Sequence, residues 1–192
     1  MLDLKQIDQQ ILRASFLVGW FFMYPMGELL DSRNPNLPEG RRPILISDID
    51  PLCGGKLAHR GAHVGEIRIH ISGPKTDWLN QGCARPHARV RSDSPNAEIC
   101  VARALVELHQ MFPAKFTNHR DGLLAMWRNG DHIAPKHVTS LLRSTVIKNG
   151  LNPSAFPLHS LRAGGATALY RAAQDIDLAA RFGRWETRPI SA

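Results

Sequence analysis

Two short segments near the end of the chain carry residue types that can hold a phosphate group. Residues 158–167 contain His159 and Arg162, three positions apart, followed by two adjacent glycines. In a helix this spacing places the histidine and the arginine on one face. Arginine offers a planar fork of donors and keeps its charge, so beside an imidazole it is suited to binding phosphate. The second segment, residues 183–185, reads Gly-Arg-Trp.

The charge balance of the whole chain favours a polyanionic partner. Its 192 residues include 24 Lys and Arg against 17 Asp and Glu, which gives a net charge of +7 and an isoelectric point near 9.8. A surplus of this size is typical of proteins that bind DNA or RNA, ahead of those that bind an acidic membrane.

The cysteines and the apolar segments bear on where the protein works. The three cysteines are widely spaced and form no C-x-x-C pair, which is typical of reduced structural thiols in the cytosol or nucleus. The N-terminus does not read as a secretory signal. The longest apolar stretch, residues 14–26, is interrupted by Gly19 and Pro25 and is too short to span a bilayer. We therefore expect a nuclear or cytoplasmic protein that is neither secreted nor in a membrane.

Hydrophobic periodicity predicts a mainly helical α+β domain with a small antiparallel sheet inserted near the front. The length and apolar content predict one ordinary core, so residues 1–192 are treated as one domain. Helical spacing or stop signals predict helices, and alternating apolar residues predict strands. The predicted helices are 4–24, 98–111, 136–148, 159–172 and 175–182, and the predicted strands are 44–49, 66–71 and 88–91.

The motifs together resemble the catalytic domain of tyrosine recombinases, the phage-integrase family. The carriers of the resemblance are His159-x-x-Arg162 with its glycine pair and the Gly-Arg-Trp segment ending at Trp185. Residues 71–77, Ile-Ser-Gly-Pro-Lys-Thr-Asp, also resemble the family's β-hairpin lysine motif, with Lys75 as the lysine. The resemblance covers roughly residues 10–187 and implies the family's helical catalytic domain.

The resemblance implies a reaction on double-stranded DNA. In the family a tyrosine attacks a phosphodiester, two arginines hold its non-bridging oxygens, and a lysine protonates the leaving oxygen. By position Arg162 corresponds to the second arginine and Lys75 to the lysine. His159 corresponds to the first histidine-type residue, and Trp185 occupies the family's His/Trp position. DNA recombination or integration, with self-association on DNA, is the implied function. We expect no cofactor and no metal.

Two departures from the family limit the expected activity. Pro25 stands where the family has its first arginine, although Glu28 retains the glutamate that follows it, and proline cannot replace a guanidinium. Neither Arg13 nor Arg33 falls in register with that position. The nucleophilic tyrosine is expected eight or nine residues after Trp185, which lies past the last residue of the sequence.

The sequence therefore predicts a recombinase-like domain that is inactive in strand cleavage as written. It reads as incomplete at the C-terminus and as lacking the family's N-terminal core-binding domain. The alternative is a non-catalytic DNA-binding module, or a relic of a mobile element. Without a nucleophile no covalent phosphotyrosine can form, whatever the other residues do.

Each candidate residue also has a purely structural interpretation. Lys75 is compatible with a solvated turn lysine, and Trp185 with a packed aromatic. Arg184 is predicted to lie at the surface or against the DNA backbone, and the two glycines after Arg162 are predicted to serve helix packing. Three histidines in one region suggest a possible metal site, namely His59, His63 and His70. Their spacing fits no helix-face pair with a carboxylate or cysteine pattern, so we expect no metal there.

Overall fold

Helix α1 (Leu4–Phe21) lies at the centre of the helical part of the structure and packs against several of the other helices. Its apolar residues recur every three or four positions, and Ile11, Ala14 and Val18 are completely buried. The structure is a computed structural model. It describes residues 4–30, 42–59, 63–71, 82–117 and 121–185.

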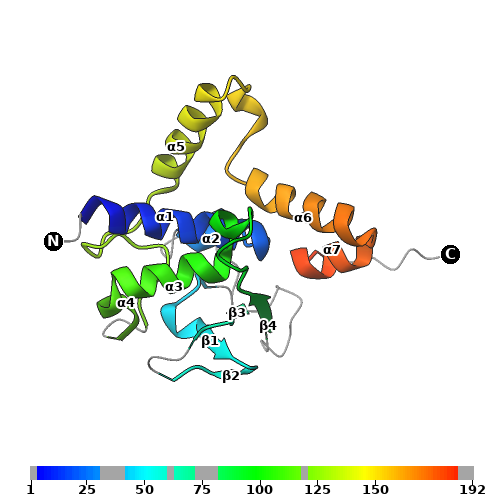
Figure 1. Cartoon of the computed structure of the whole chain (residues 1–192). Coiled ribbons are helices and arrows are strands. Elements are labelled where there is room, and N and C mark those ends of the chain that lie inside the picture. Colours follow the sequence, from blue (N-terminus) through cyan, green and yellow to red (C-terminus); the bar gives the residue numbers. More distant parts are fainter. Residues whose placement is uncertain (1–3, 31–41, 60–62, 72–81, 118–120, 186–192) are drawn as a thin grey trace.

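Six further helices and four strands complete the described part of the chain (Figure 1). The helices are α2 (Met26–Leu30), α3 (Val101–Met111), α4 (Pro113–Thr117), α5 (Pro135–Lys148), α6 (Ser160–Ala173) and α7 (Ile176–Gly183). The strands are β1 (Ile49–Cys53), β2 (Lys56–Leu57), β3 (Glu66–Ile71) and β4 (Cys83–Ala88). Three short 3₁₀ turns lie at Ile46–Asp48, Ala97–Ile99 and Pro153–Ala155.

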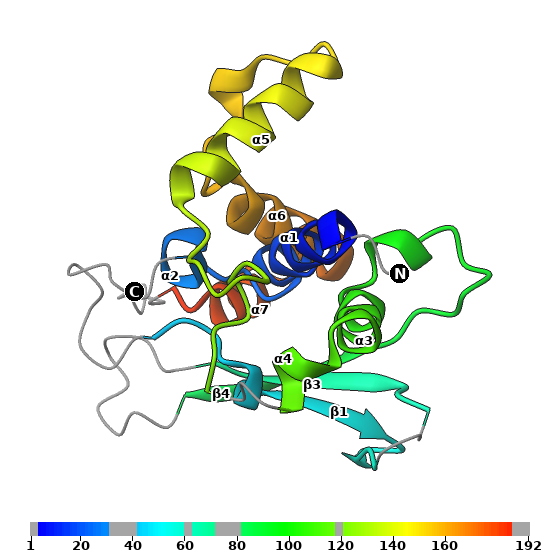
Figure 2. The same ribbon diagram turned by 90° about the vertical axis from the view of Figure 1, so that its left-hand side faces the viewer.

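The strands form one antiparallel sheet in the order β2-β1-β3-β4. Alternate residues of β3 are buried, namely Ile67, Ile69 and Ile71, because successive side chains of a strand point to opposite faces. Helices α1 and α3 lie over one face of this sheet (Figure 2). The predicted class, mainly α with a small antiparallel sheet near the front, is confirmed.

The last three helices lie outside this helix-and-sheet core. Helix α6 packs along α1 and α7, whereas α5 projects away from the core (Figure 1). In α5 only Val138 and Val146 are buried, and in α6 only Gly165 is. The predicted helices 136–148, 159–172 and 175–182 are confirmed within one residue at each end. Among the described residues, no helix is both long and apolar enough to cross a membrane.

The predicted strand over residues 44–49 is wrong. Ile44 and Ile46 are buried as its alternation requires, but the chain turns through a 3₁₀ segment, and the strand begins only at Ile49. The cause is Asp48, whose carboxylate accepts hydrogen bonds from the Leu45 amide at 2.8 Å and from the Arg42 guanidinium at 2.5 and 2.6 Å. A local carboxylate-to-backbone bond competes with strand pairing.

The partner strand of β3 is also misplaced in the prediction, which put it at residues 88–91. The strand runs from Cys83 to Ala88, and Arg85 lies opposite Ile69. The sequence Cys83–Ala88 contains Pro86, and proline is unusual inside a strand because it lacks an amide donor. Since β4 is an edge strand, one missing donor is tolerated. Helix α1 likewise ends at Phe21, three residues earlier than predicted, and α3 begins at Val101, three residues later.

Helix α4 buries a lysine in the core. The Lys115 side chain donates to the backbone oxygens of Leu123 at 2.9 Å and Met126 at 3.2 Å, and the residue is only 2% exposed. Burial disfavours the charged ammonium and lowers the pKa of Lys115 from 10.5 to about 8. The lysine thus ties α4 to the segment before α5 through bonds to two carbonyls.

We expect the stability of the protein to rise with pH between about 8 and 10.5 because of Lys115. In that window the unfolded chain still binds a proton that the folded chain has released, so unfolding becomes harder as pH increases. Relative to Lys115→Met, the wild type should gain about 3 kcal/mol of unfolding free energy across the window. Urea unfolding at several pH values measures this. The exposed Lys136→Met is the control, and parallel profiles for wild type and Lys115→Met would contradict the assignment.

Candidate functional site

The two segments singled out in the sequence meet at the C-terminal end of α7. Arg162, on the first turn of α6, donates through Nη2 to the backbone oxygen of Gly183, the last residue of α7. Its guanidinium carbon also lies 5.0 Å from the centroid of the Trp185 ring, a cation–π contact. The structure therefore brings Arg162 and Trp185 together.

A second arginine reaches the same helix end from the sheet. Arg85 of β4 donates to the backbone oxygens of Phe182 and of Arg181, the latter at 2.7 Å, and stacks 4.6 Å from the Phe182 ring centroid. Burial lowers the pKa of Arg85 from its usual value, with a further contribution from the nearby charge of Arg184. The last carbonyls of a helix lack partners within the helix and carry partial negative charge, so they attract guanidinium groups.

Arg184 is buried, and the prediction that it lies at the surface or on the DNA backbone is wrong. Its side chain is 5% exposed, forms an ion pair with the buried Glu28 at 3.3 Å, and lies 4.8 Å from the ring centroid of Tyr24. Arg184 adopts a left-handed conformation (φ 58°) that ends α7. This turn directs its side chain to the α1–α2 junction, where Pro25 and Glu28 lie.

The other predicted site residues are placed less fully. His159 occupies the N-cap position of α6 and is exposed, one helical turn before Arg162. Lys75, which falls between β3 and β4 in the sequence, lies outside the described residues. Arg33, which falls after α2, also lies outside them. Arg13 pairs with Glu107 of α3 at 2.5 Å, which commits it to holding α1 against α3.

The two glycines after Arg162 serve close packing, as predicted. A methyl group on Gly164 would come within 2.3 Å of the Trp20 ring, and one on Gly165 within 2.1 Å of the Trp20 backbone oxygen. Helices α6 and α1 therefore touch almost backbone to backbone where they cross. A larger residue at either position would push α6 away from α1, and with it the helix turn that carries Arg162.

Neither tyrosine of the chain is placed to act on a phosphate held by Arg162. Tyr24 is fully buried, and its hydroxyl donates to the Arg42 backbone oxygen at 2.7 Å. Tyr170 is exposed on α6, eight residues after Arg162, which corresponds to about 12 Å along a helix. The sequence contains two tyrosines, so this chain presents Arg162 without a neighbouring tyrosine.

In the sequence Arg85 belongs to the segment that resembles the hairpin lysine motif, but its contact with the end of α7 was not predicted, nor was the pairing of Arg184 with Glu28. In the sequence Cys83, Arg85 and His87 alternate with alanine or proline, and in the structure they share the half-buried face of β4, so this alternation is a signal that could have found Arg85. The pairing of Arg184 with Glu28 joins residues 156 positions apart and has no local signal.

The chemistry available at this site is the binding of an anion. Arg162 and Arg85 bring two guanidinium groups to one helix end, and Trp185 adds an aromatic ring that is 42% exposed. His70, one of the three histidines considered for a metal, instead bonds Asp50 at 2.7 Å.

No protein-family model and no curated protein matches the chain.

We expect Gly165→Ala to destabilise the protein by about 1–3 kcal/mol, because the new methyl group must push α6 away from the Trp20 backbone. Gly27→Ala in α2 is the matched control, since no atom lies within 4 Å of the added methyl. That change should be neutral or stabilising by up to about 1 kcal/mol. Equal effects of the two substitutions in denaturant unfolding would contradict the close helix crossing.

Proposed function

We propose that the chain is a DNA-binding domain of the tyrosine-recombinase type that acts in DNA recombination or integration. The observation that carries this proposal is the convergence of Arg162 and Trp185, 23 positions apart in sequence, at the end of α7. The resemblance pairs these same two positions around a DNA phosphate. A guanidinium has five N–H donors in a fixed fork, so the bond to Gly183 is compatible with a phosphate contact on the same group.

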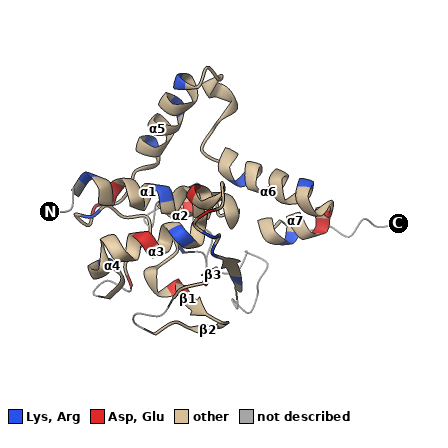
Figure 3. Cartoon of the chain, in the orientation of Figure 1, with Lys and Arg blue, Asp and Glu red and all other residues tan. Residues whose placement is uncertain are grey.

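The charge of the helices around this site supports a DNA partner. Helices α5 and α6 together carry five Lys and Arg and no Asp or Glu. Figure 3 shows basic residues along both helices and on α7. Because α5 projects from the core, these charges lie along an extended surface rather than in a closed pocket (Figure 1). Such a distribution suits a long, regularly charged polyanion.

A second candidate function, DNA binding without strand cleavage, is favoured by the α1–α2 junction. Pro25 stands at the position of the family's first arginine, and the nearby Arg184 is held by Glu28. A single lost donor to the developing charge of a transition state costs about 3 kcal/mol. Together with the placement of Tyr24 and Tyr170, this favours binding of duplex DNA by this chain with no covalent intermediate.

We expect Arg162→Met to weaken the binding of duplex DNA by about tenfold or more at low salt, since a hydrogen bond to a charged group is worth roughly 1.5–3 kcal/mol. The slope of log K against log salt should also fall by about 0.9, the value for one lost phosphate contact. Fluorescence anisotropy over a salt series measures both quantities. Circular dichroism of each variant shows whether α6 stays folded.

Arg128→Met is the matched control, because it removes the same charge from an exposed residue whose amide bonds Asp8 on the first half of α1. Its DNA affinity should stay within about twofold of wild type. Equal losses for Arg162→Met and Arg128→Met would show non-specific attraction and contradict a phosphate site at Arg162. A wild type that does not bind duplex at low salt would exclude both candidate functions.

We also expect no covalent protein–DNA adduct from this chain on a nicked duplex. Denaturing electrophoresis after incubation detects such an adduct as a shifted band. A shifted band that disappears in Tyr170→Phe would overturn the placement of Tyr170 away from the phosphate. A shifted band that disappears in Tyr24→Phe would do the same for the buried Tyr24.

A further inference from the structure

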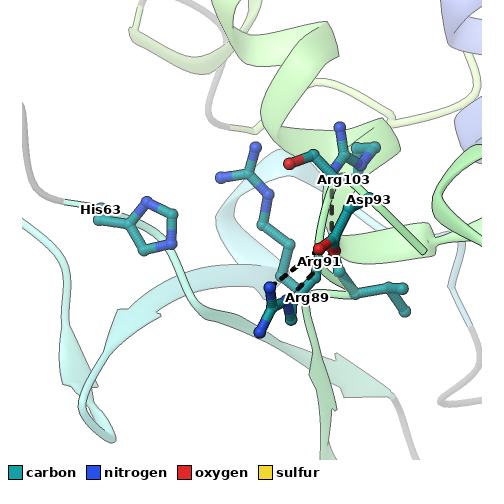
Figure 4. A pocket seen from close by; sticks show the side chains of 7 residues that line it. His63, Arg89, Arg91, Asp93 and Arg103 are labelled. Carbon is teal, nitrogen blue, oxygen red and sulfur yellow. Dashed lines mark hydrogen bonds and ion pairs between the residues drawn. The ribbon is translucent and has the colours of Figure 1, made fainter.

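A hollow of about 360 Å³, separate from the site at the end of α7, lies beyond the end of the β3–β4 pair where Glu66 is opposite Ala88. It is lined by the residues just before β3, the residues just after β4 and the first turn of α3. Figure 4 shows His63 on one side of it and the arginines on the other. The lining residues are His63, Arg89, Val90, Arg91, Ser92, Asp93 and Arg103.

The walls of this hollow carry a concentrated positive charge. Three arginines face one carboxylate, Asp93, which holds Arg91 through bonds of 2.9 and 3.2 Å. Both partners of that bond are exposed, with 85% of the Arg91 side chain and 67% of the Asp93 side chain accessible, so the pair is easily separated. The lining therefore keeps an excess of two positive charges even with the histidine neutral.

The backbone around the hollow holds the other two arginines in place. Arg89 donates to the Val64 oxygen at 3.3 Å, and Arg103 donates to the Val90 oxygen at 3.4 Å. The amide of Val90 in turn donates to the sulfur of Cys100, the N-cap residue of α3, at 3.3 Å. Fixed guanidinium groups lose little freedom when they bind, which is the property of a preorganised site.

Arg103 carries a further sign of an unfilled site. Its side chain is 15% exposed, and its Nη1 lies 3.9 Å from Glu107, a carboxylate that also pairs with Arg13 at 2.5 Å. Among the described residues no hydrogen-bond acceptor serves the buried Nε of Arg103. A buried guanidinium donor without an acceptor is costly. Arg103 stands in the first turn of α3, where the helix dipole adds positive potential.

We propose that this hollow binds a phosphate monoester. Planar guanidinium groups match the oxygens of a phosphate, and a site with an excess of two positive charges suits a dianion better than the single charge of a phosphodiester. The volume is in the lower range of small-ligand pockets. The site is distinct from the end of α7, because Arg85 and Arg89 are about 13 Å apart by strand rise. The proposal does not rest on DNA binding.

The test is a calorimetric titration of the whole chain with inorganic phosphate at low salt. We expect saturable binding with a dissociation constant below about 1 mM. Arg91→Met should weaken it by about tenfold, since it removes a charged donor. Asp93→Asn should strengthen it several-fold, because it frees Arg91 from its competing carboxylate. Arg128→Met, which removes the same charge from an exposed residue outside the hollow and outside α5 and α6, should leave the affinity unchanged.

Three results would overturn the proposal. The first is an absence of saturation up to about 10 mM phosphate. The second is an equal effect of Arg91→Met and Arg128→Met. The third is a loss of duplex affinity in Arg91→Met as large as its loss of phosphate affinity, which would assign the hollow to the DNA backbone. Phosphate binding that persists in a chain unable to bind DNA would support this proposal while excluding the function proposed above.

Discussion

The candidate site depends on the contact between arginine side chains and the carbonyl oxygens at the end of α7. Arg162 and Arg85 come from a helix and a strand that are 77 positions apart in the sequence, yet both donate to this one helix end. The contact satisfies carbonyls that a helix leaves without partners, and it concentrates positive charge where the helix dipole is negative. It thereby fixes α7 and Trp185 against both the sheet and α6.

The same end of α7 is secured from a third side by Arg184. Its ion pair with Glu28 is buried on both sides, and its guanidinium lies over Tyr24. Removing one partner of such a pair leaves an uncompensated buried charge, so the α1–α2 junction and the end of α7 depend on each other. Pro25 lies in this junction. Pro25, where the resemblance calls for an arginine, thus lies beside a buried glutamate, Glu28, that is already paired with Arg184.

Local patterns predicted the helices well and the sheet less well. The helices at 159–172 and 175–182 follow from periodicity and stop signals, which act within a few residues. The strand error at 44–49 came from Asp48, whose bonds to Leu45 and Arg42 outweigh the alternation of buried isoleucines. For the site, the two glycines predicted a close helix contact, but only the structure shows that the partner is Trp20 of α1. The pairing of Arg184 with Glu28 was not predicted, because only the tertiary fold brings them together.

The proposed function depends on a DNA phosphate bound at Arg162 beside Trp185. The most direct measurement is the ¹⁵N–¹H NMR signal of the Trp185 indole during a titration with duplex DNA, assigned by its loss in Trp185→Phe. If a phosphate binds there, we expect a shift of this signal in the wild type at low salt and a much smaller shift in Arg162→Met. An indole signal that stays in place while other signals of the protein move would contradict it.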